Sequence, residues 1–589
     1  MRSRPVSALA LAAFTLTSAV PAALPARSLP KPPPSPVRCN PAMVQEGYAS
    51  PGKPGRAGSA KHMPAPLYIP SPPPPAPAPP PPPSIVPGAA SPSQNFAVPG
   101  APSPRIMGLI SREEQRERYD GEAVAPVQSV AEHPVSTFSV DVDTGSYANV
   151  RRFLNQGGLP PAAAVRTEEM LNYFRYDYPR PESRETPFTV TTDLSTTPWN
   201  PQTRLMRVGL RGYDVRAGER PAANLVFLVD VSGSMDSPDK LPLVKASLAM
   251  LADQLTPKDR VSIVVYAGAA GVVLEPTHDR KYVKQALDCL SAGGSTAGGE
   301  GIQLAYATAR ANFMPGGINR ILIATDGDFN VGVSDNEALK EMVKRQRDDG
   351  ITLTTLGFGQ GNYNEALMEG IADLGNGNYA YIDSASEAQK VLGEELSSTL
   401  FTIAKDVKIQ IEFNPALVSE YRLIGYENRQ LAEEDFANDK VDAGDIGAGH
   451  QVTALYEIVP AGARGWLPDR RYEANRPAAG SAGAASELAY VKLRYKLPDG
   501  TTSKLIERAV PARAVADARA PRGDMAFAVA VAGFGQKLRG DTHLGDFSFA
   551  DIRALAGGQS DYWRQEFVKL AGVAGAQGRG AGVGGDGSE

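Results

Sequence analysis

The chain of 589 residues is 42% hydrophobic, which is enough for two or three domains with cores of their own. Its 60 basic and 65 acidic residues give a net charge of −5, and lysine and arginine form no dense block. Because binding to nucleic acid or to acidic lipid relies on such a block, the composition disfavours both ligands.

The N-terminus has the layout of a secretory signal, predicted over residues 1–26. Arg2 and Arg4 precede an apolar stretch at residues 8–20, and small residues follow that stretch. No later uncharged apolar run reaches the roughly 18 to 20 residues that span a bilayer. We therefore expect an exported protein, periplasmic, secreted or at the cell surface, without a transmembrane segment in the mature chain.

Residues 27–107 consist mainly of proline, alanine, serine and glycine, and the densest proline run lies at residues 72–83. Such a segment cannot bury enough apolar surface to fold, so a disordered, proline-rich linker is predicted. The chain has two cysteines, Cys39 in this linker and Cys289. Its fold is therefore expected to rest on its cores rather than on a disulfide framework.

Residues 108–221 predict a small N-terminal α+β extension. Its strands are expected at residues 135–142, 188–194 and 205–210, and its amphipathic helices at residues 147–156 and 166–176.

Residues 222–405 alternate regularly between apolar strands and helices. Strands are predicted at residues 225–229, 260–266, 272–275, 320–325, 352–357 and 379–382. Helices are predicted at residues 243–255, 282–290, 301–313, 336–347, 364–373 and 385–403. This alternation predicts an α/β domain with a doubly wound, mostly parallel, Rossmann-like sheet. Sheets of this class bind ligands at the carboxyl ends of their strands.

Residues 406–573 return to period two and predict a C-terminal β-rich domain with terminal helices, followed by a disordered, glycine-rich tail at residues 574–589. Strands are expected at residues 407–413, 451–459, 488–495 and 503–510, and helices at 525–538, 549–556 and 563–573. Both flanks of the α/β domain are rich in strands, so they are alternatively one composite β domain into which the α/β domain is inserted. Insertion would place the ligand-binding face of the sheet opposite the composite domain.

Three oxygen-bearing side chains follow the strand at residues 225–229, namely Asp230, Ser232 and Ser234. Oxygen-bearing side chains at alternate positions, next to a turn that contains glycine, can converge on a hard cation. A six-coordinate cation needs more ligands than one loop supplies. Thr296, in a glycine-flanked turn, and Asp326, at the end of the strand at residues 320–325, would reach the same rim of the sheet. The sequence therefore predicts a divalent-metal site.

These five positions resemble the metal-ion-dependent adhesion site of von Willebrand factor type A domains. The resemblance implies that Ser232 and Ser234 coordinate Mg²⁺ directly, and that the threonine and the aspartates do so directly or through water. It also implies one open coordination position for an Asp or Glu carboxylate of a protein partner. Two neutral hydroxyls and two carboxylates leave Mg²⁺ electrophilic enough for that ligand, with Mn²⁺ and Ca²⁺ as alternative ions. The implied function is non-enzymatic, metal-dependent protein–protein binding or adhesion.

Segments outside the metal site extend the resemblance. Residues 141–155, 198–200, 326–332 and 552–571 are similar to those of the bacterial YfbK-like exported proteins. Those proteins combine an N-terminal extension, a type A domain and a distinct C-terminal domain, and the similarity covers residues 132–572.

Two other functions remain open. One is a structural scaffold in envelope assembly, whose metal only stabilises a loop. The other is a hydrolase, because residues 142–146 contain the Asp-Thr-Gly-Ser string of aspartic proteases, which use two such aspartates. The string occurs once, and the residues after it predict a helix that Asp143 or Thr144 would cap.

The glycine-rich residues 357–361 are interpreted as a tight strand-to-helix turn rather than as a dinucleotide-binding loop. The sequence indicates neither the identity of the partner nor the oligomeric state.

Overall fold

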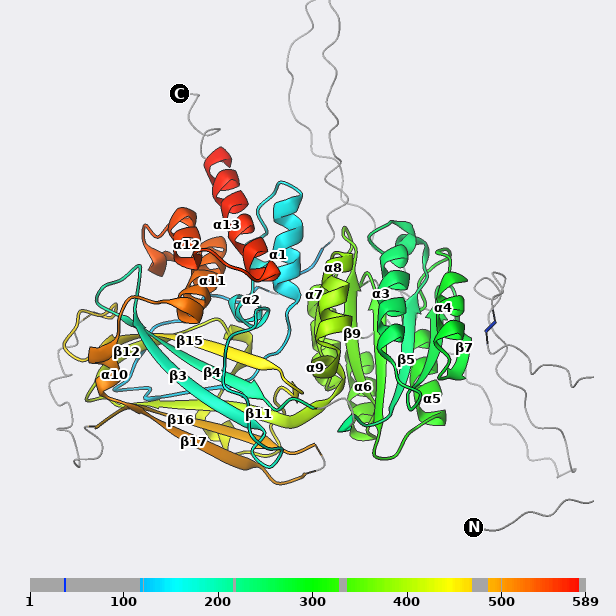
Figure 1. Cartoon of the computed structure of the whole chain (residues 1–589), viewed down its shortest axis with the longest axis horizontal. Coiled ribbons are helices and arrows are strands. Elements are labelled where there is room, and N and C mark those ends of the chain that lie inside the picture. Colours follow the sequence, from blue (N-terminus) through cyan, green and yellow to red (C-terminus); the bar gives the residue numbers. More distant parts are fainter. Residues whose placement is uncertain are drawn as a thin grey trace, which may run out of the picture.

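The computed structural model describes seven ranges: residues 37–38, 117–119, 121–215, 219–327, 336–468, 486–498 and 500–581. The predicted signal peptide lies outside them, as does the predicted linker apart from Val37 and Arg38. An α/β domain and a β sandwich topped by helices lie side by side (Figure 1).

The α/β domain is built on a six-stranded sheet with the order β10-β9-β8-β5-β6-β7. Its strands are β5 Ala223–Asp230, β6 Arg260–Tyr266, β7 Ala270–Thr277, β8 Ile318–Thr325, β9 Thr352–Phe358 and β10 Tyr379–Ile382. Neighbouring strands pair in parallel except β6 and β7, which are antiparallel. The predicted doubly wound, mostly parallel sheet is confirmed.

Helices cover both faces of this sheet. They are α3 Leu241–Gln254, α4 Arg280–Asp288, α5 Gly298–Ala311, α6 Asn336–Asp348 and α7 Glu365–Leu374. Apolar residues of α3 and α4 pack in one core with one face of the sheet, and those of α5, α6 and α7 form a separate core on the other face. Each core buries alternate residues of the central strand β5, which explains why β5 is a continuous apolar run.

The single helix predicted at residues 385–403 was wrong. The chain forms α8 Ala385–Gln389, a π-helical turn η5 Lys390–Glu394 and α9 Leu396–Leu400, and then enters strand β11 at Thr402. Thr402 pairs with Gly447 of β14, so a long-range strand pairing overrides the local helical pattern.

The sandwich consists of two antiparallel sheets, with the strand orders β1-β12-β15-β4-β3 and β13-β2-β11-β16-β17. The strands are β1 Gln128–Ser129, β2 Val135–Ser139, β3 Phe188–Thr196, β4 Arg204–Gly212, β11 Thr402–Phe413, β12 Val418–Ile424, β13 Gln430–Leu431, β14 Ile446–Gly447, β15 Gln451–Pro460, β16 Glu487–Lys496 and β17 Lys504–Pro511. Aromatic contacts join the sheets, with ring centroids 5.4 Å apart for Phe413 and Tyr456 and 5.1 Å apart for Phe188 and Tyr495.

Both sheets mix strands from the two flanks of the α/β domain. β4 from the N-terminal flank pairs with β15 from the C-terminal flank, and β2 lies between β13 and β11. The two flanks therefore form one composite β domain into which the α/β domain is inserted, as the alternative reading of the sequence predicts.

A layer of helices caps the sheet that contains β15. Its helices are α1 Gly145–Asn155, α2 Thr167–Asn172, α11 Gly523–Arg539, α12 Phe549–Ala556 and α13 Tyr562–Ala581. The short helix α10 Arg513–Asp517 lies apart from this layer, against β3 and β16 of the sandwich (Figure 1). Phe174 packs edge-on against Phe527 at 4.9 Å and Phe567 at 5.7 Å in the core of this layer. Among the described residues, no helix is both long and apolar enough to cross a bilayer.

The predicted disordered tail at residues 574–589 begins too early. Helix α13 continues to Ala581 because Ala574 is fully buried in the helical core and Gly575 lies close to Phe549. Residues 582–589 lie outside the described residues.

Val37 and Arg38 lie along the edge strand β7. Val37 pairs with Leu274, and the N–H of Arg38 donates to the carbonyl of Val273 at 2.9 Å. An edge strand offers unpaired backbone groups for such an addition. Cys289, directly after α4, is disulfide-bonded.

The two domains meet across buried charges. Arg429, from the turn before β13, forms ion pairs with Asp141 at 3.1 Å, Asp143 at 3.4 Å, Glu369 at 3.1 Å and Asp373 at 2.6 Å. The first two carboxylates belong to the N-terminal flank and the other two to α7, so one guanidinium joins three separate segments of the chain.

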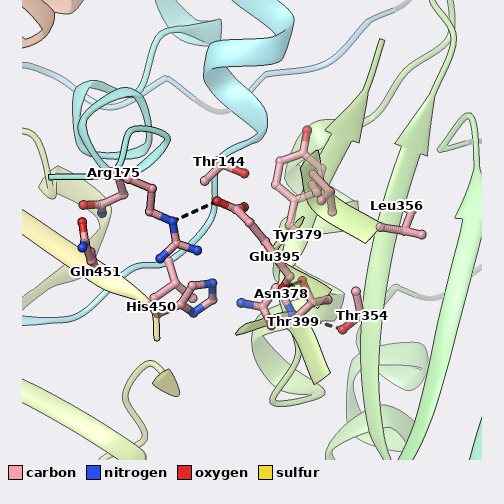
Figure 2. Close-up of a pocket in the computed structure, with 14 residues that line it drawn as sticks. Thr144, Arg175, Thr354, Leu356, Asn378, Tyr379, Glu395, Thr399, His450 and Gln451 are labelled. Carbon is pink, nitrogen blue, oxygen red and sulfur yellow. Dashed lines mark hydrogen bonds and ion pairs between the residues drawn. The ribbon is translucent and has the colours of Figure 1, made fainter. Parts of the chain in front are cut away.

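A cavity of about 30 Å³ lies at the same junction (Figure 2). Arg175 and Glu395 form an ion pair at 3.2 Å beside His450. Burial lowers the pKa of His450 to about 3, so its ring is neutral. A volume of this size holds about two water molecules rather than a substrate.

Replacing Arg429 with methionine should destabilise the junction strongly. The Arg429→Met change leaves the buried Asp141, Asp143 and Glu369 without their shared cation, and breaking a buried ion pair costs about 3–5 kcal/mol. Thermal and denaturant unfolding would measure this loss. An unfolding free energy equal to that of the wild type would contradict the proposed importance of the junction.

Glu365 should make stability depend on pH. Burial raises the pKa of Glu365 from 4.5 to about 8, and its Oε1 accepts a hydrogen bond from Asn149 at 3.1 Å. The unfolded chain releases this proton near pH 4.5, so the stabilising contribution is complete below that pH and is lost as pH rises through 8. The Glu365→Gln variant has no titratable group at this position, so it lacks this pH dependence. Its melting temperature relative to the wild type should therefore rise between about pH 5 and pH 9, by the equivalent of a few kcal/mol.

The control for this prediction is Glu341→Gln, an exposed position on α6. A melting-temperature difference between Glu365→Gln and the wild type that stays constant across the pH range would contradict the assignment.

Candidate metal centre

The pairing register of two adjacent parallel strands positions the first residues of the site. Val229 of β5 is paired with Ala324 of β8, so Asp230 and Thr325 follow side by side at the carboxyl ends. The hydroxyl of Thr325 donates to Asp230 Oδ2 at 2.9 Å, and the backbone N–H of Ser232 donates to Oδ1 at 2.9 Å. Both carboxylate oxygens of the fully buried Asp230 are therefore held in place.

The two serines follow on the turn after β5. Their hydroxyl oxygens are 3.1 Å apart, with Ser232 buried and Ser234 exposed in the short 3-10 turn η4 Gly233–Asp236. The site is therefore enclosed on the side of Asp230 and Ser232 and open to solvent at Ser234.

The loop that carries Thr296 is fastened to this turn by backbone hydrogen bonds. The N–H of Gly293 donates to Val231 O at 2.8 Å, and the N–H of Gly233 donates to Gly294 O at 3.0 Å. Thr296 itself is 8% exposed and lies two residues before α5. The structure thus brings the threonine loop alongside the Asp230 turn.

Asp326 follows Thr325 and is fully buried. Its Oδ2 accepts from the ammonium of Lys240 at 2.9 Å and from the amide of Asn362 at 3.2 Å. Lys240 also donates to Asn362 Oδ1 at 3.1 Å. The sequence reading missed Lys240 and Asn362, because the contacts depend on where α3 begins and how the loop after β9 folds.

One local signal could have pointed to Lys240. It occupies the N-cap position of α3, where the helix dipole disfavours a cation that has no anionic partner.

Gly359 makes room for the lysine side chain in the glycine-rich turn predicted at residues 357–361. It has φ +72°, and a Cβ there would lie 2.3 Å from Lys240 Cγ and 2.4 Å from Cε. The carbonyl of Gly359 accepts a hydrogen bond from the hydroxyl of Tyr381 at 2.6 Å, which holds the turn in place.

The donors of the site suit a hard divalent cation. All are carboxylate or hydroxyl oxygens, the ligands that Mg²⁺ and Ca²⁺ prefer. Burial raises the pKa of Asp230 to about 6, with the charge of Asp326 acting in the same direction. A bound cation would reduce the electrostatic repulsion between these two carboxylates. That Asp230, Ser232, Ser234, Thr296 and Asp326 together ligate a metal stays a prediction.

In the described part of the chain, a cluster of three carboxylates lies elsewhere, at the domain junction. Oxygens of Asp141, Asp143 and Glu369 lie within 4.8 Å of one another. Arg429 forms ion pairs with all three, so a guanidinium already supplies the positive charge there.

Asp143, the residue of the protease-like string, is buried at this junction. Its Oδ1 accepts the backbone N–H of Tyr379 at 2.7 Å, which attaches the N-terminal flank to the start of β10. Burial raises its pKa well above the usual range. The predicted helix cap was wrong, because Thr144 occupies the N-cap position of α1 without a side-chain capping bond and Asp143 binds β10 instead.

The N-terminal flank reaches the rim of the proposed metal site. Glu117 accepts the N–H of Gly361 at 2.9 Å, and Arg118 pairs with Asn364, on either side of Asn362. The expectation that the ligand-binding face lies opposite the composite domain was therefore wrong. The reason is that the flank follows the β10 edge of the sheet and extends over the loop after β9.

The comparisons agree with this fold. Residues 224–394 match the family model of the von Willebrand factor type A domain, and residues 113–207 match a model described as von Willebrand factor. The α/β domain is therefore a type A domain. Residues 398–576 match the C-terminal region of the uncharacterized protein YfbK.

The chain belongs to the YfbK family. It is 49% identical to the uncharacterized protein YfbK of Escherichia coli (strain K12) over 457 residues, which are 76% of this chain and 79% of that relative. The uncharacterized protein sll0103 of Synechocystis sp. is 32% identical over 187 residues, 31% of this chain and 43% of that protein. The solved structure of a von Willebrand factor type A protein from Catenulispora acidiphila covers 68% of this chain and 91% of its own, with 18% identity and a TM-score of 0.37.

Adding a methyl group at Gly359 should displace Lys240. The Gly359→Ala change combines backbone strain of about 1–3 kcal/mol at positive φ with the steric overlap described above. Gly316→Ala is the matched control, because Gly316 has φ +69° and nothing lies within 4 Å of its added Cβ. Gly359→Ala should cost more unfolding free energy than Gly316→Ala.

The excess should shrink in a Lys240→Ala background, where the overlapping side-chain atoms are absent, and a double-mutant cycle measures this coupling. Equal costs for the two glycine changes would rule out the tight fit between Gly359 and Lys240.

Proposed function

We propose that this protein is an exported, non-enzymatic protein that captures a protein partner through a divalent metal, Mg²⁺ first and Mn²⁺ or Ca²⁺ as alternatives. Type A domains often mediate protein–protein interaction, and this chain contains one. The observation that carries the metal-dependent part is the convergence of Asp230, Ser232, Ser234 and Asp326 at adjacent strand ends, with Ser234 exposed.

In this proposal five residues would hold the ion: Asp230, Ser232, Ser234, Thr296 and Asp326. When bound, the ion supplies an open coordination position for an Asp or Glu carboxylate of the partner. The chain's own contribution is to hold the oxygens ready. Thr325 and the N–H of Ser232 fix one carboxylate, while Lys240 and Asn362 fix the other.

The placement of the site suits a binding function. Its carboxylates stand at the ends of strands in a packed sheet rather than on a long loop, and rigid elements hold ligands more accurately than loops do. The exposed Ser234 marks the side from which a partner side chain can approach.

Export is proposed from the N-terminal residues 1–26, with the periplasm, the cell surface and the medium as possible destinations. The proline-rich segment that follows would act as a spacer, since polyproline extends by about 3.1 Å per residue.

Asp230→Ala should abolish metal binding and leave the fold intact. The change removes a carboxylate that would hold the ion directly or through water, so Mg²⁺ affinity measured by calorimetry should fall by about 100-fold. Circular dichroism should remain native-like. Asp236→Ala is the matched control, because Asp236 is exposed two residues beyond Ser234 and is not a proposed ligand. Equal Mg²⁺ binding by the wild type and Asp230→Ala would contradict the proposal.

The same variants separate binding from a scaffold role. Proteins retained from an envelope fraction in Mg²⁺ and released by chelator should appear with wild-type and Asp236→Ala baits and be absent with Asp230→Ala. If chelator lowers only the melting temperature, and all three baits retain the same proteins, the metal is purely structural and the scaffold alternative holds.

A further inference from the structure

Lys240 is a buried cation directly beside the proposed metal ligands. Lys240 is 6% exposed, and its ammonium lies 2.9 Å from Asp326 Oδ2 and 3.1 Å from Asn362 Oδ1. A buried ammonium is costly unless it is paired and hydrogen-bonded. This lysine therefore depends on the same carboxylate that the metal would use.

Two further observations indicate that the lysine position is specified by the fold. The N-terminus of α3 repels a cation through the helix dipole, so the contact with Asp326 must outweigh that repulsion. Gly359, at φ +72°, leaves open the space that the lysine stem fills. The first observation concerns charge and the second concerns packing, so they support the assignment independently.

We propose that Lys240 is a fixed counter-cation that gives the metal-loaded site a net positive charge and thereby selects an anionic, carboxylate-bearing partner. This inference rests on the proposed function. Two carboxylates and a divalent ion cancel in charge, while the three hydroxyls are neutral. The ammonium of Lys240 then leaves one positive charge, which a single Asp or Glu side chain neutralises.

The same ammonium has opposite effects on the two binding steps. It repels the incoming metal and competes for Asp326, so it weakens metal binding. It attracts the partner carboxylate, so it strengthens partner binding once the metal is in place. In the metal-free protein it keeps Asp326 paired. A residue that merely positioned Asp326 would instead favour both steps.

The test compares the wild type with Lys240→Met, which keeps the stem and removes the charge. Calorimetry with Mn²⁺ alone gives the metal affinity. Paramagnetic broadening of the Glu side-chain protons in N-acetyl-Gly-Glu-Gly-amide by protein-bound Mn²⁺ reports the carboxylate, and the matching Gln peptide is the blank. Lys240→Arg retains the charge, and Lys258→Met changes an exposed lysine after α3.

Lys240→Met should bind Mn²⁺ about ten-fold more tightly or better, and lose most of the broadening of the Glu peptide. In chelator its melting temperature should fall, because Asp326 then lacks the ammonium of Lys240, and Mn²⁺ should raise that temperature more than in the wild type. Lys240→Arg and Lys258→Met should follow the wild type in both titrations.

Other outcomes distinguish this inference from the proposed function. Weaker or unchanged Mn²⁺ binding by Lys240→Met, with normal binding by the wild type, overturns the counter-cation and leaves the metal-dependent function standing. Binding of Mn²⁺ by Lys240→Met alone supports the counter-cation and overturns the function proposed for the wild type. If neither protein binds Mn²⁺, both are overturned.

Discussion

The proposed site depends on the register in which β5 and β8 pair. Val229 lies opposite Ala324, and this places the hydroxyl of Thr325 against Asp230 and makes Asp326 the next residue at the same rim. A shift of one residue would turn every side chain of one strand to the other face. The apolar residues that fill the cores on both faces of the sheet therefore also set the position of the oxygens.

Buried carboxylates and their counter-cations recur in two places in this molecule. At the rim of the sheet, Lys240 compensates Asp326. At the domain junction, Arg429 compensates carboxylates from the N-terminal flank and from α7. In both places a cation from a distant segment makes burial of the acid tolerable, because an unpaired buried charge is very unfavourable. The rim differs in having exposed Ser234 beside it, which leaves that site open to a further ligand.

The features that the sequence predicts correctly are local ones. Apolar periodicity predicts the strands and most helices of the type A domain, and Asp230, Ser232 and Ser234 lie in one short segment at the end of β5. The features it misses depend on contacts between distant segments. Lys240 reaches Asn362 across 122 residues of sequence, and β11 begins inside a predicted helix because Thr402 pairs with β14. Arg429 gives no local signal of the four carboxylates that surround it.

The composite β domain could be predicted from the sequence only in part. Strand-rich flanks suggested it, but only the pairing of β4 with β15 decides between one domain and two. The same long-range folding brings Glu117 to the loop beside Asn362, where it accepts a hydrogen bond from Gly361 at the rim of the proposed metal site.

The most direct test of the central claim is a crystal structure of the protein soaked with Mn²⁺, with anomalous scattering recorded at the manganese edge. The account predicts one strong anomalous peak in contact with the hydroxyl oxygens of Ser232 and Ser234, at roughly the 2.0–2.6 Å typical of oxygen ligands to divalent ions, with Asp230 bound directly or through water. No peak at these residues, or a peak confined to the carboxylates of Asp141, Asp143 and Glu369, would contradict it.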